Sequence, residues 1–339
     1  MLNWGLGHAS RSIPLIDRFI QQNHQVVICS DGIALDLLKQ EYPDLVFEKL
    51  PSYNVHYKHE SITTNIILAL PNILSAIKQE TKLTQELQVK YRAEMIISDN
   101  RYGCYSKNCP SYIMTHQLNL QAKIKWQGSF ASSLLHRFLK RFDRVLIPDH
   151  EGNESIAGEL INKPDVKNKT FLGPISRMKF QDSSLEYNLC IILSGPEPQR
   201  SVFEELLVQQ LHTFEGRVVF IRGTLKKRPE YLKAVSFEVF DLLNSSEINN
   251  YLCSSKLILS RSGYSSLMDY YSTRSSAILI PTPGQTEQEY LAERMNAKGL
   301  FYSTSQKDLI LSEAIEAAKD YTGFVDGIDN RLSELIAGL

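Results

Sequence analysis

Short apolar runs of strand length alternate along the chain with longer runs in which apolar residues recur at helical spacing. This alternation is typical of the α/β class, in which helices join and cover parallel strands. The predicted strands lie at 25–29, 95–100, 111–114, 144–148, 170–172, 188–193, 217–223, 235–243, 256–260, 277–281 and 300–302. Predicted helices begin near Ser10, Ser201 and Gly263, and others cover 65–92, 123–144, 244–253, 305–319 and 327–336.

The series of strand–helix units starts twice, each time with a glycine-bearing loop. At 339 residues the chain exceeds the usual size of a single core. We therefore predict two Rossmann-like domains facing each other across a cleft, over 1–172 and 173–339. A loop such as Gly5–His8 should follow a buried strand, but only Met1–Asn3 precede it, so we expect a truncated first strand.

Composition is that of an ordinary globular protein, 43% hydrophobic and 22% charged. The 37 basic and 38 acidic residues leave a net charge of −1, which offers no global attraction to nucleic acid. Five scattered cysteines lack metal-ligand spacing, so buried thiols are expected. The sequence shows no signal peptide and no apolar run of spanning length, which favours a cytoplasmic protein.

The stretch Ser260–Glu289 contains the most specific pattern. A predicted strand turns at Gly263 into a helix, and the unpaired N–H groups and dipole at a helix start attract anions. Asp269 lies about one helical turn inside, where a carboxylate can accept hydrogen bonds from a ribose diol. A second strand, a Pro-Thr-Pro-Gly turn and an acidic, amide-rich helix start follow. The arrangement suits a nucleotide diphosphate.

This stretch resembles the donor-binding motif of the family 28 glycosyltransferases. In that family a Ser-Arg-Ser/Ala-Gly loop is followed by an acidic residue on the helix and by a Pro-rich loop ending in Gln. The best-known members add N-acetylglucosamine from its UDP derivative to the lipid-linked precursor of peptidoglycan. This chain has Asp where the family usually has Glu, and the matching residues are Arg261, Ser262, Gly263, Asp269, Pro281, Gln285 and Gln288.

The resemblance implies the GT-B architecture, with a last helix crossing back to the N-terminal domain. It also implies a cell-envelope enzyme that transfers sugar from a UDP-sugar to a glycan or lipid-linked acceptor, with inversion and without a metal or other cofactor. The residues expected at the donor are Ser194, Gly195, Arg200, Arg222, Arg261, Ser262, Gly263, Tyr264, Ser265, Asp269, Gln285 and Gln288. For Ser194 and Gly195 an ordinary turn is the alternative, because Pro196 and Pro198 remove amide donors.

Polar residues of catalytic type stand in a loop and at two strand ends of the N-terminal half, where ligands of parallel sheets bind. The GLGH loop and the segment after 114 resemble family segments on the acceptor side. We take His8 first as the catalytic base, with Asp99 or His116 as alternatives. The structural alternatives are a capping His8 and a loop-capping Asp99. The residues expected at the acceptor are Gly7, His8, Asp99, Asn100, His116 and Asn119.

The segment 123–144 is both basic and apolar. It predicts either an amphipathic helix packed on the core, which we favour, or a peripheral contact with the anionic inner face of a membrane. No pair of acidic residues stands at a strand end in the spacing of a metal site, and Asp149-His150-Glu151 is the nearest acidic group. This agrees with a metal-independent reaction.

Two rival functions remain open at this stage. UDP-sugar hydrolases or epimerases on the same scaffold resemble this chain in a GxGH loop followed by Arg, here Arg11. A non-catalytic protein that only binds a nucleotide-sugar is the other rival. Fold alone separates none of these functions.

Overall fold

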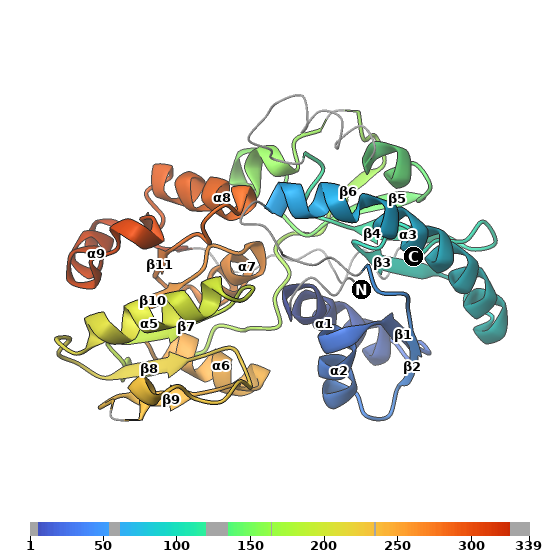
Figure 1. Ribbon diagram of the computed structural model, residues 1–339. Helices are drawn as coiled ribbons and strands as arrows, with labels where there is room; N and C mark the ends of the chain where they lie inside the picture. The colour runs from blue at the N-terminus through green and yellow to red at the C-terminus, as the bar shows by residue number, and fades with distance from the viewer. Residues whose placement is uncertain (1–5, 54–61, 120–134, 164, 234, 326–339) are drawn as a thin grey trace. The chain divides into compact units, whose positions relative to one another are not determined.

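The computed structural model describes residues 6–53, 62–119, 135–163, 165–233 and 235–325. By its internal contacts the chain divides after Ile175, and the C-terminal unit begins at Ser176. Both units consist of parallel strands joined by helices, as the hydrophobic pattern predicts (Figure 1). The predicted α/β class is therefore confirmed.

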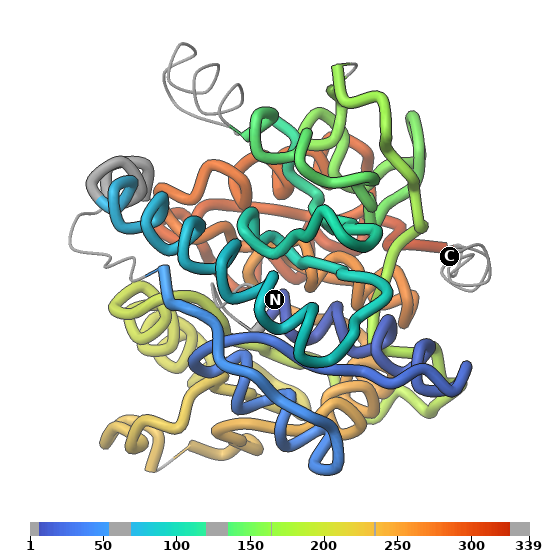
Figure 2. Tube along the Cα trace, turned by 90° about the vertical axis from the view of Figure 1, so that its right-hand side faces the viewer, coloured from blue at the N-terminus to red at the C-terminus, as the bar shows by residue number. Residues whose placement is uncertain are grey.

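In the N-terminal unit β1 (Val27–Ser30) pairs with β2 (Val46–Lys49), and a separate parallel sheet has the order β3-β4-β5-β6. Leu15 of α1 packs against Tyr112 and Met114 of this second sheet. The helix α3 is long and continuous in both views of the molecule (Figures 1 and 2). The bounds are α1 (Leu6–Gln21), α2 (Gly32–Glu41), α3 (Ile62–Tyr91), β3 (Ile96–Asp99), β4 (Ser111–Met114), β5 (Arg144–Ile147) and β6 (Lys169–Phe171).

In the C-terminal unit six parallel strands have the order β12-β11-β10-β7-β8-β9. The helix α5 lies across these strands in Figure 1, and its apolar residues share a core with every second residue of β7 and β8 and with α9. The bounds are β7 (Leu189–Ile192), α5 (Gln199–Leu211), β8 (Val218–Ile221), β9 (Glu238–Phe240), α6 (Ser245–Cys253), β10 (Ile258–Ser260), α7 (Tyr264–Thr273), β11 (Ala277–Leu279), α8 (Thr286–Ala297), β12 (Tyr302–Ser303) and α9 (Leu311–Ala317).

Three local expectations need correction. The first helix, expected to begin near Ser10, already begins at Leu6, so Gly7 and His8 lie in its first turn. Ser10 lies inside this helix, and its hydroxyl donates to the carbonyl of Gly7. The strand β2 was not predicted, because its side chains are half or fully exposed and give no apolar run. The helix expected from 305 is preceded by a 3-10 turn and begins at Leu311.

Two other expectations concern residues that the structure does not describe. The truncated first strand would involve residues 1–5, and the last helix would cover 327–336. Both lie outside the described residues.

Candidate active site

The strand order of the C-terminal sheet brings the predicted donor loops to one edge. From β7 the chain proceeds to β8 and β9 on one side, and to β10, β11 and β12 on the other. In parallel sheets ligands bind outside the carboxyl ends of the strands where the order reverses, here between β7 and β10. The loops after β7, β10 and β11 are therefore neighbours, and a Cβ placed on Gly195 would lie 3.7 Å from the hydroxyl of Thr282.

Gly263 stands at the start of α7, as its N-cap. Its φ of −73° is accessible to any residue, and no side chain caps the helix. A Cβ at this position would meet only the hydroxyl of Ser266, at 3.8 Å. Neither the backbone angle nor the packing of the protein requires a glycine here. The helix start is thus open to a group that approaches the backbone closely, as an anion does.

The neighbouring loops are tied to one another by hydrogen bonds. Ser262 is buried and its hydroxyl donates to the carbonyl of Gln288 at 2.8 Å. The Gln288 side-chain oxygen accepts from the amide of Thr282 at 2.8 Å. Gln285 is the N-cap of α8, but its side chain makes no capping bond. Gln288 and Ser262 therefore fix the loop geometry, which leaves Gln285 as the amide better placed to meet a ligand.

Gly223, which was not among the expected donor residues, supports the loop after β7, and four expected residues lie in or beside these loops. A Cβ on Gly223 would lie 2.2 Å from the carbonyl oxygen of Leu193, so this glycine lets β8 approach the loop after β7. Ser194 and Gly195 of that loop are exposed. Tyr264 is buried and Ser265 is half-buried in the first turn of α7.

Asp269 lies in α7, as predicted, and contacts the start of the C-terminal unit. Its carboxylate accepts from the Ser176 hydroxyl at 2.5 Å. Burial raises the pKa of Asp269 to about 6, although the Ser176 hydrogen bond and the charge of Arg177 oppose that shift. The carboxyl group is therefore partly protonated near pH 6.

The three arginines expected at the donor are used inside the fold. Arg200 and Arg222 are buried and both bind one carboxylate oxygen of Glu204, at 2.7 and 2.8 Å. Arg261 is buried over the ring of Phe203, 4.0 Å from its centroid, and burial lowers the pKa of Arg261 to about 9. Its guanidinium donates to the carbonyls of Gln199, Ile280 and Pro281 and to the side chain of Gln306.

These contacts give the arginines a structural role. A guanidinium paired with a buried carboxylate, or enclosed by carbonyls, stabilises the loops that it joins. Arg261 ties the segment after β11 to the start of α5. Among the expected donor contacts, the backbone at Gly263, the exposed loop after β7 and the side chain of Gln285 are sources of hydrogen bonds that these structural contacts leave in place.

In the N-terminal unit the three predicted catalytic residues meet around Arg11. The Arg11 guanidinium donates to Asp99 through Nε at 2.8 Å and through Nη2. It also lies 2.8 Å from Nδ1 of His116 and 2.8 Å from Nδ1 of His8. Nδ1 of His8 is 3.0 Å from Oδ1 of Asp99. The hydroxyl of Ser12 adds a bond to Asp99 at 3.2 Å.

The local folding explains why these side chains meet. Asp99 ends β3 and His116 follows β4, which is the adjacent parallel strand. His8 and Arg11 are three residues apart on α1, so both side chains lie on the same helix face. From the sequence we named Arg11 only in the resemblance to UDP-sugar hydrolases and epimerases, and did not assign it to the site. Its spacing of one helical turn from His8 was a second signal.

The charges of this cluster determine its protonation. Burial disfavours the Asp99 anion, but the charges and hydrogen bonds of Arg11 and His8 outweigh burial and hold the pKa of Asp99 well below its usual range. Burial and the Arg11 charge lower the pKa of His8, and Asp99 only partly opposes them. His8 is therefore neutral at pH 7, beside an ionised carboxylate.

The remaining acceptor candidates have different surroundings. Asn100 has a left-handed φ of 53°, and its buried side-chain oxygen has no hydrogen-bond partner in the part of the chain that the structure describes. The amide nitrogen of Asn119 donates to the carbonyls of Glu159 and Asn162 at 2.9 and 2.7 Å, which joins two loops. Gly7 contributes its carbonyl to Ser10.

Two further predictions concern Asp149 and the basic segment. Asp149 is buried and accepts from the amides of His150, Ile156 and Ala157, so it organises the loop after β5. In the described residues no group of three or more His, Cys, Asp or Glu side chains is arranged to hold a metal ion. Of the basic segment 123–144, residues 123–134 lie outside the described residues. In the rest, Phe138 and three other apolar side chains are buried, and the basic ones are exposed.

Comparisons with known proteins point to glycosyltransferases. Residues 200–321 match the glycosyltransferase family 28 C-terminal domain. A protein of Methanosarcina mazei described as an uncharacterized glycosyltransferase is 21% identical, over 98% of this chain and 92% of that protein. The crystal structure of Acinetobacter baumannii MurG is similar with a TM-score of 0.55 and 12% identity, over 98% of this chain and 97% of that chain. The spinosyn rhamnosyltransferase SpnG, solved with thymidine diphosphate, is similar with a TM-score of 0.63 and 13% identity, over 97% of this chain and 92% of that chain.

Residues 200–321 thus resemble the C-terminal domain of the family 28 glycosyltransferases, and the solved neighbours show that the chain has the GT-B fold. The predicted fold, family resemblance and enzyme class are therefore confirmed. Within the described residues no helix combines the length and apolar character needed to cross a bilayer.

Proposed function

We propose that this glycosyltransferase moves a sugar, of the N-acetylglucosamine type, from a UDP-sugar to an acceptor hydroxyl, with inversion at the anomeric carbon and without a metal. In this proposal the C-terminal unit, which begins at Ser176, binds the donor. The N-terminal unit, which ends its first segment at Ile175, binds a glycan or lipid-linked acceptor in the cytoplasm, in cell-envelope synthesis. The observation that carries the proposal is the uncapped start of α7 at Gly263, next to the exposed loop at Ser194 and Gly195.

The diphosphate is proposed to lie at this helix start. Backbone N–H groups at an uncapped helix start, together with the helix dipole, stabilise negative charge as it grows on the leaving diphosphate. Such donors do the work that a metal ion does in other transferases. Asp269, lying deeper in α7, is proposed to accept hydrogen bonds from the ribose, and Gln285 to contact the sugar or the phosphate.

His8 is the proposed base, with Asp99 orienting it. In the proposed tautomer Nδ1 of His8 carries the proton and donates to Oδ1 of Asp99 at 3.0 Å, so it does not accept from the neighbouring Arg11 guanidinium, and Nε2 is free to accept a proton. Arg11 holds Asp99 ionised, so Asp99 keeps the imidazole in this tautomer. His116, bound to the same guanidinium, is proposed as a contact to the acceptor.

The proposed reaction is a single displacement. The acceptor oxygen forms a bond to the anomeric carbon while the bond from that carbon to the diphosphate oxygen breaks. The bonding electron pair leaves with UDP, and the acceptor proton moves to Nε2 of His8. Attack from the face opposite the leaving group inverts the configuration.

The deciding experiment incubates the protein with a panel of UDP-, GDP- and TDP-sugars and measures binding and nucleotide release, with and without added acceptor glycans and lipids. We expect tight binding of a UDP-sugar and release of UDP that depends on an acceptor. In His8→Gln we expect the same UDP affinity and a loss of transfer of about 100-fold or more. Preference for GDP- or TDP-sugars would overturn the nucleotide assignment.

A UDP-sugar hydrolase or epimerase is the second candidate, favoured by one observation. Arg11 follows the GxGH segment and is the centre of the cluster: it donates to Asp99, and its guanidinium lies 2.8 Å from Nδ1 of each histidine. If water or the bound sugar itself replaces an external acceptor, the same panel shows UDP release or sugar rearrangement at catalytic rates with no acceptor added. Transfer only in the presence of an acceptor removes this candidate.

A further inference from the structure

A second buried group of charges stands two residues beyond Asp99. The guanidinium of Arg101 donates to the Glu80 carboxylate at 2.6 Å and to the Asp31 carboxylate. It also donates to the carbonyl of Pro51 at 2.9 Å. The side chains of Arg101, Glu80 and Asp31 are buried, each at most 2% exposed. The reaction proposed above makes no use of them.

Further donors complete the surroundings of the two carboxylates. Oε2 of Glu80 accepts from the Tyr53 hydroxyl at 3.0 Å and from the Gly103 amide at 3.2 Å. The hydroxyl of Ser52 donates to Asp31. When buried charges are satisfied in this way, a displacement of any member leaves a charge without its partner. The group around Arg101 therefore resists movement of the segments that it joins.

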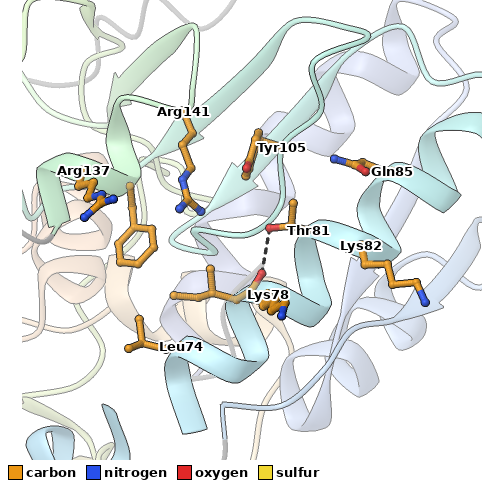
Figure 3. Close-up of a pocket in the computed structure, with 10 residues that line it drawn as sticks. Leu74, Lys78, Thr81, Lys82, Gln85, Tyr105, Arg137 and Arg141 are labelled. Atoms are coloured by element: carbon orange, nitrogen blue, oxygen red, sulfur yellow. Dashed lines mark hydrogen bonds between the residues drawn. The ribbon is translucent and has the colours of Figure 1, made fainter. Parts of the chain in front are cut away.

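The helix α3 presents Glu80 to the turn after β3. Lys78 and Lys82 are four residues apart and line a pocket on one side of the helix, which Figure 3 shows beside Tyr105. Glu80 lies midway between them in the sequence, so its side chain is directed to the opposite side of the helix. A Cβ on Gly103 would lie 2.6 Å from Cβ of Glu80, so the turn and the helix are in direct contact.

The bonds of Arg101 join parts of the N-terminal unit that share no strand pairing. Among the described residues β1 and β2 form a sheet of their own, separate from the sheet β3-β4-β5-β6. Asp31 directly follows β1, and Pro51 comes two residues after β2, whereas Arg101 comes two residues after β3. Arg101 thus links the carboxyl ends of the smaller sheet to the carboxyl end of the larger one.

The cluster around Arg11 spans the same two sheets. The helix α1, which carries His8 and Arg11, shares a core with β1 through Ile13 and Ile28. Asp99 belongs to the end of β3, in the larger sheet. The distance of 3.0 Å between Nδ1 of His8 and Oδ1 of Asp99 therefore depends on how the two sheets are held against each other.

The backbone between Asp99 and Arg101 has a conformation that few residues adopt. Asn100 has a left-handed φ of 53°. The Ser98 hydroxyl donates to the carbonyl of Arg101 at 2.7 Å and accepts from its amide at 3.2 Å, which closes the turn. A left-handed residue other than glycine persists only where its surroundings fix it. A shift of the Arg101 guanidinium therefore moves Asp99 through this turn.

We propose that Arg101 is a positioning residue for the base of the reaction. It anchors the turn after β3 to Asp31 and Glu80, and so holds Asp99 within hydrogen-bonding distance of Nδ1 of His8. Arg101 itself contacts no substrate. The inference rests on the proposed function in that His8 is taken as the base, but the positioning is a property of the protein without substrate.

Nitrogen NMR of the full chain, labelled in its histidines, tests the proposal at pH 7 without substrate. Imidazole nitrogen shifts report which nitrogen carries the proton, and the signals that vanish in His8→Gln are those of His8. In the wild type we expect the proton on Nδ1. The ammonium of Arg101→Lys lacks the guanidinium fork that binds both carboxylates and Pro51 together, so we expect the fraction of this tautomer to fall about twofold or more.

Arg222→Lys is the matched control. Arg222 is also a buried guanidinium after a strand, and it binds the two carboxylates of Glu204 and Asp241. This variant should lose stability as Arg101→Lys does and leave the His8 tautomer unchanged. An equal change of tautomer in the two variants, or no change in folded Arg101→Lys, would overturn the proposal.

Glu80→Gln tests the same anchor with a smaller change, in case Arg101→Lys does not fold. The amide oxygen still accepts hydrogen bonds, but the charge that holds Arg101 is lost, so the fraction of the Nδ1 tautomer should again fall. Lys78→Gln, on the exposed side of the same helix, should leave that fraction unchanged. The same fraction in Glu80→Gln as in Lys78→Gln would contradict the anchor.

Kinetics distinguish this inference from the proposed function. With a UDP-sugar and an acceptor, Arg101→Lys should lower kcat by about tenfold and leave KM for the donor unchanged, because the donor is proposed to bind in the other unit. Equal kcat in folded Arg101→Lys and the wild type would overturn the positioning role alone. If the wild type transfers no sugar, the proposed function fails, and the NMR comparison still decides whether Arg101 positions Asp99.

Discussion

The two candidate sites use arginine in opposite ways. In the N-terminal unit the guanidinium of Arg11 binds the carboxylate of Asp99 and both histidines that are candidates for catalysis. In the C-terminal unit Arg261 is enclosed by backbone carbonyls, and Arg222 is paired with Glu204. One arginine sets the protonation of reactive groups, whereas the others hold loops in place.

The difference shows what each kind of site requires. Proton abstraction needs a base that is unprotonated at the working pH, and the fixed charge of Arg11 lowers the pKa of His8 and keeps Asp99 ionised. Stabilising a diphosphate needs several donors at fixed positions, which a helix start supplies from the backbone. The side chains around the start of the helix can then form contacts that stabilise the surrounding loops. The following changes, from the largest expected effect to the smallest, test this contrast.

Asp99→Asn should have the largest effect, and only on the chemistry of the N-terminal unit. The amide does not hold the His8 tautomer, and without the anion the pKa of His8 falls further. We expect kcat/KM for transfer to fall by about 10²–10⁴-fold, while UDP affinity measured by calorimetry is unchanged. Asp149→Asn is the matched control, because Asp149 is also a buried carboxylate after a strand but binds backbone amides. A similar loss of transfer per folded molecule in both variants would contradict a special role for Asp99.

Arg222→Met should lower stability and leave donor binding intact. It removes a buried partner of Glu204, and we expect the free energy of unfolding to drop by about 3 kcal/mol. Denaturant unfolding measures this, and UDP titration of the folded variant should give an unchanged Kd. Arg217→Met, at an exposed ion pair near the start of the same strand, should cost less than about 1 kcal/mol. A large loss of UDP affinity in folded Arg222→Met would restore this arginine to the donor site.

Gly263→Ala should lower the affinity for UDP and leave stability almost unchanged, which is the opposite of the result expected for Arg222→Met. The backbone angle suits alanine and the space is open, so the free energy of unfolding should change by less than about 1 kcal/mol. A methyl group at the helix start obstructs a diphosphate, and we expect UDP affinity to fall about tenfold. Thermal unfolding and calorimetry measure the two quantities. Unchanged affinity would mean that the diphosphate does not approach this helix start.

Asp269→Asn should have the smallest effect, which appears as a change in how the free energy of unfolding depends on pH. Its pKa is raised from an ordinary 3.8 to about 6, so between these values the folded chain keeps a proton that the unfolded chain has lost. Its contribution to stability is therefore present below pH 4 and is lost as the pH rises through 6. Asp269→Asn should remove this component from unfolding measured across that range.

The affinity for UDP should change with pH in the opposite direction to the stability contribution of Asp269. If the ionised carboxylate accepts hydrogen bonds from the ribose, UDP affinity rises as the pH increases through about 6 and is lower in Asp269→Asn. Titrations at pH 5 and pH 7 on both proteins provide the comparison. An equal pH dependence in the two proteins would exclude Asp269 as its source.

Much of the fold follows from the sequence because buried parallel strands are continuous apolar runs. The strands β7, β8, β10 and β11 were predicted for this reason. The exposed edge strand β2 has no such run and was missed. The start of α1 was also misplaced, because a glycine-rich segment predicts a loop whether or not tertiary contacts extend the helix through it.

The sequence by itself determined the alternation of strands and helices, the turn at Gly263, and the presence of His8, Asp99 and His116 near loop and strand ends. These depend on local spacing, which the order of residues specifies. Only the tertiary structure decided which charges meet. Arg11 joins residues about a hundred positions apart, and Glu204 engages two arginines expected at the ligand. A charged side chain takes the partner that burial places beside it, and burial depends on how strands are ordered in the sheet.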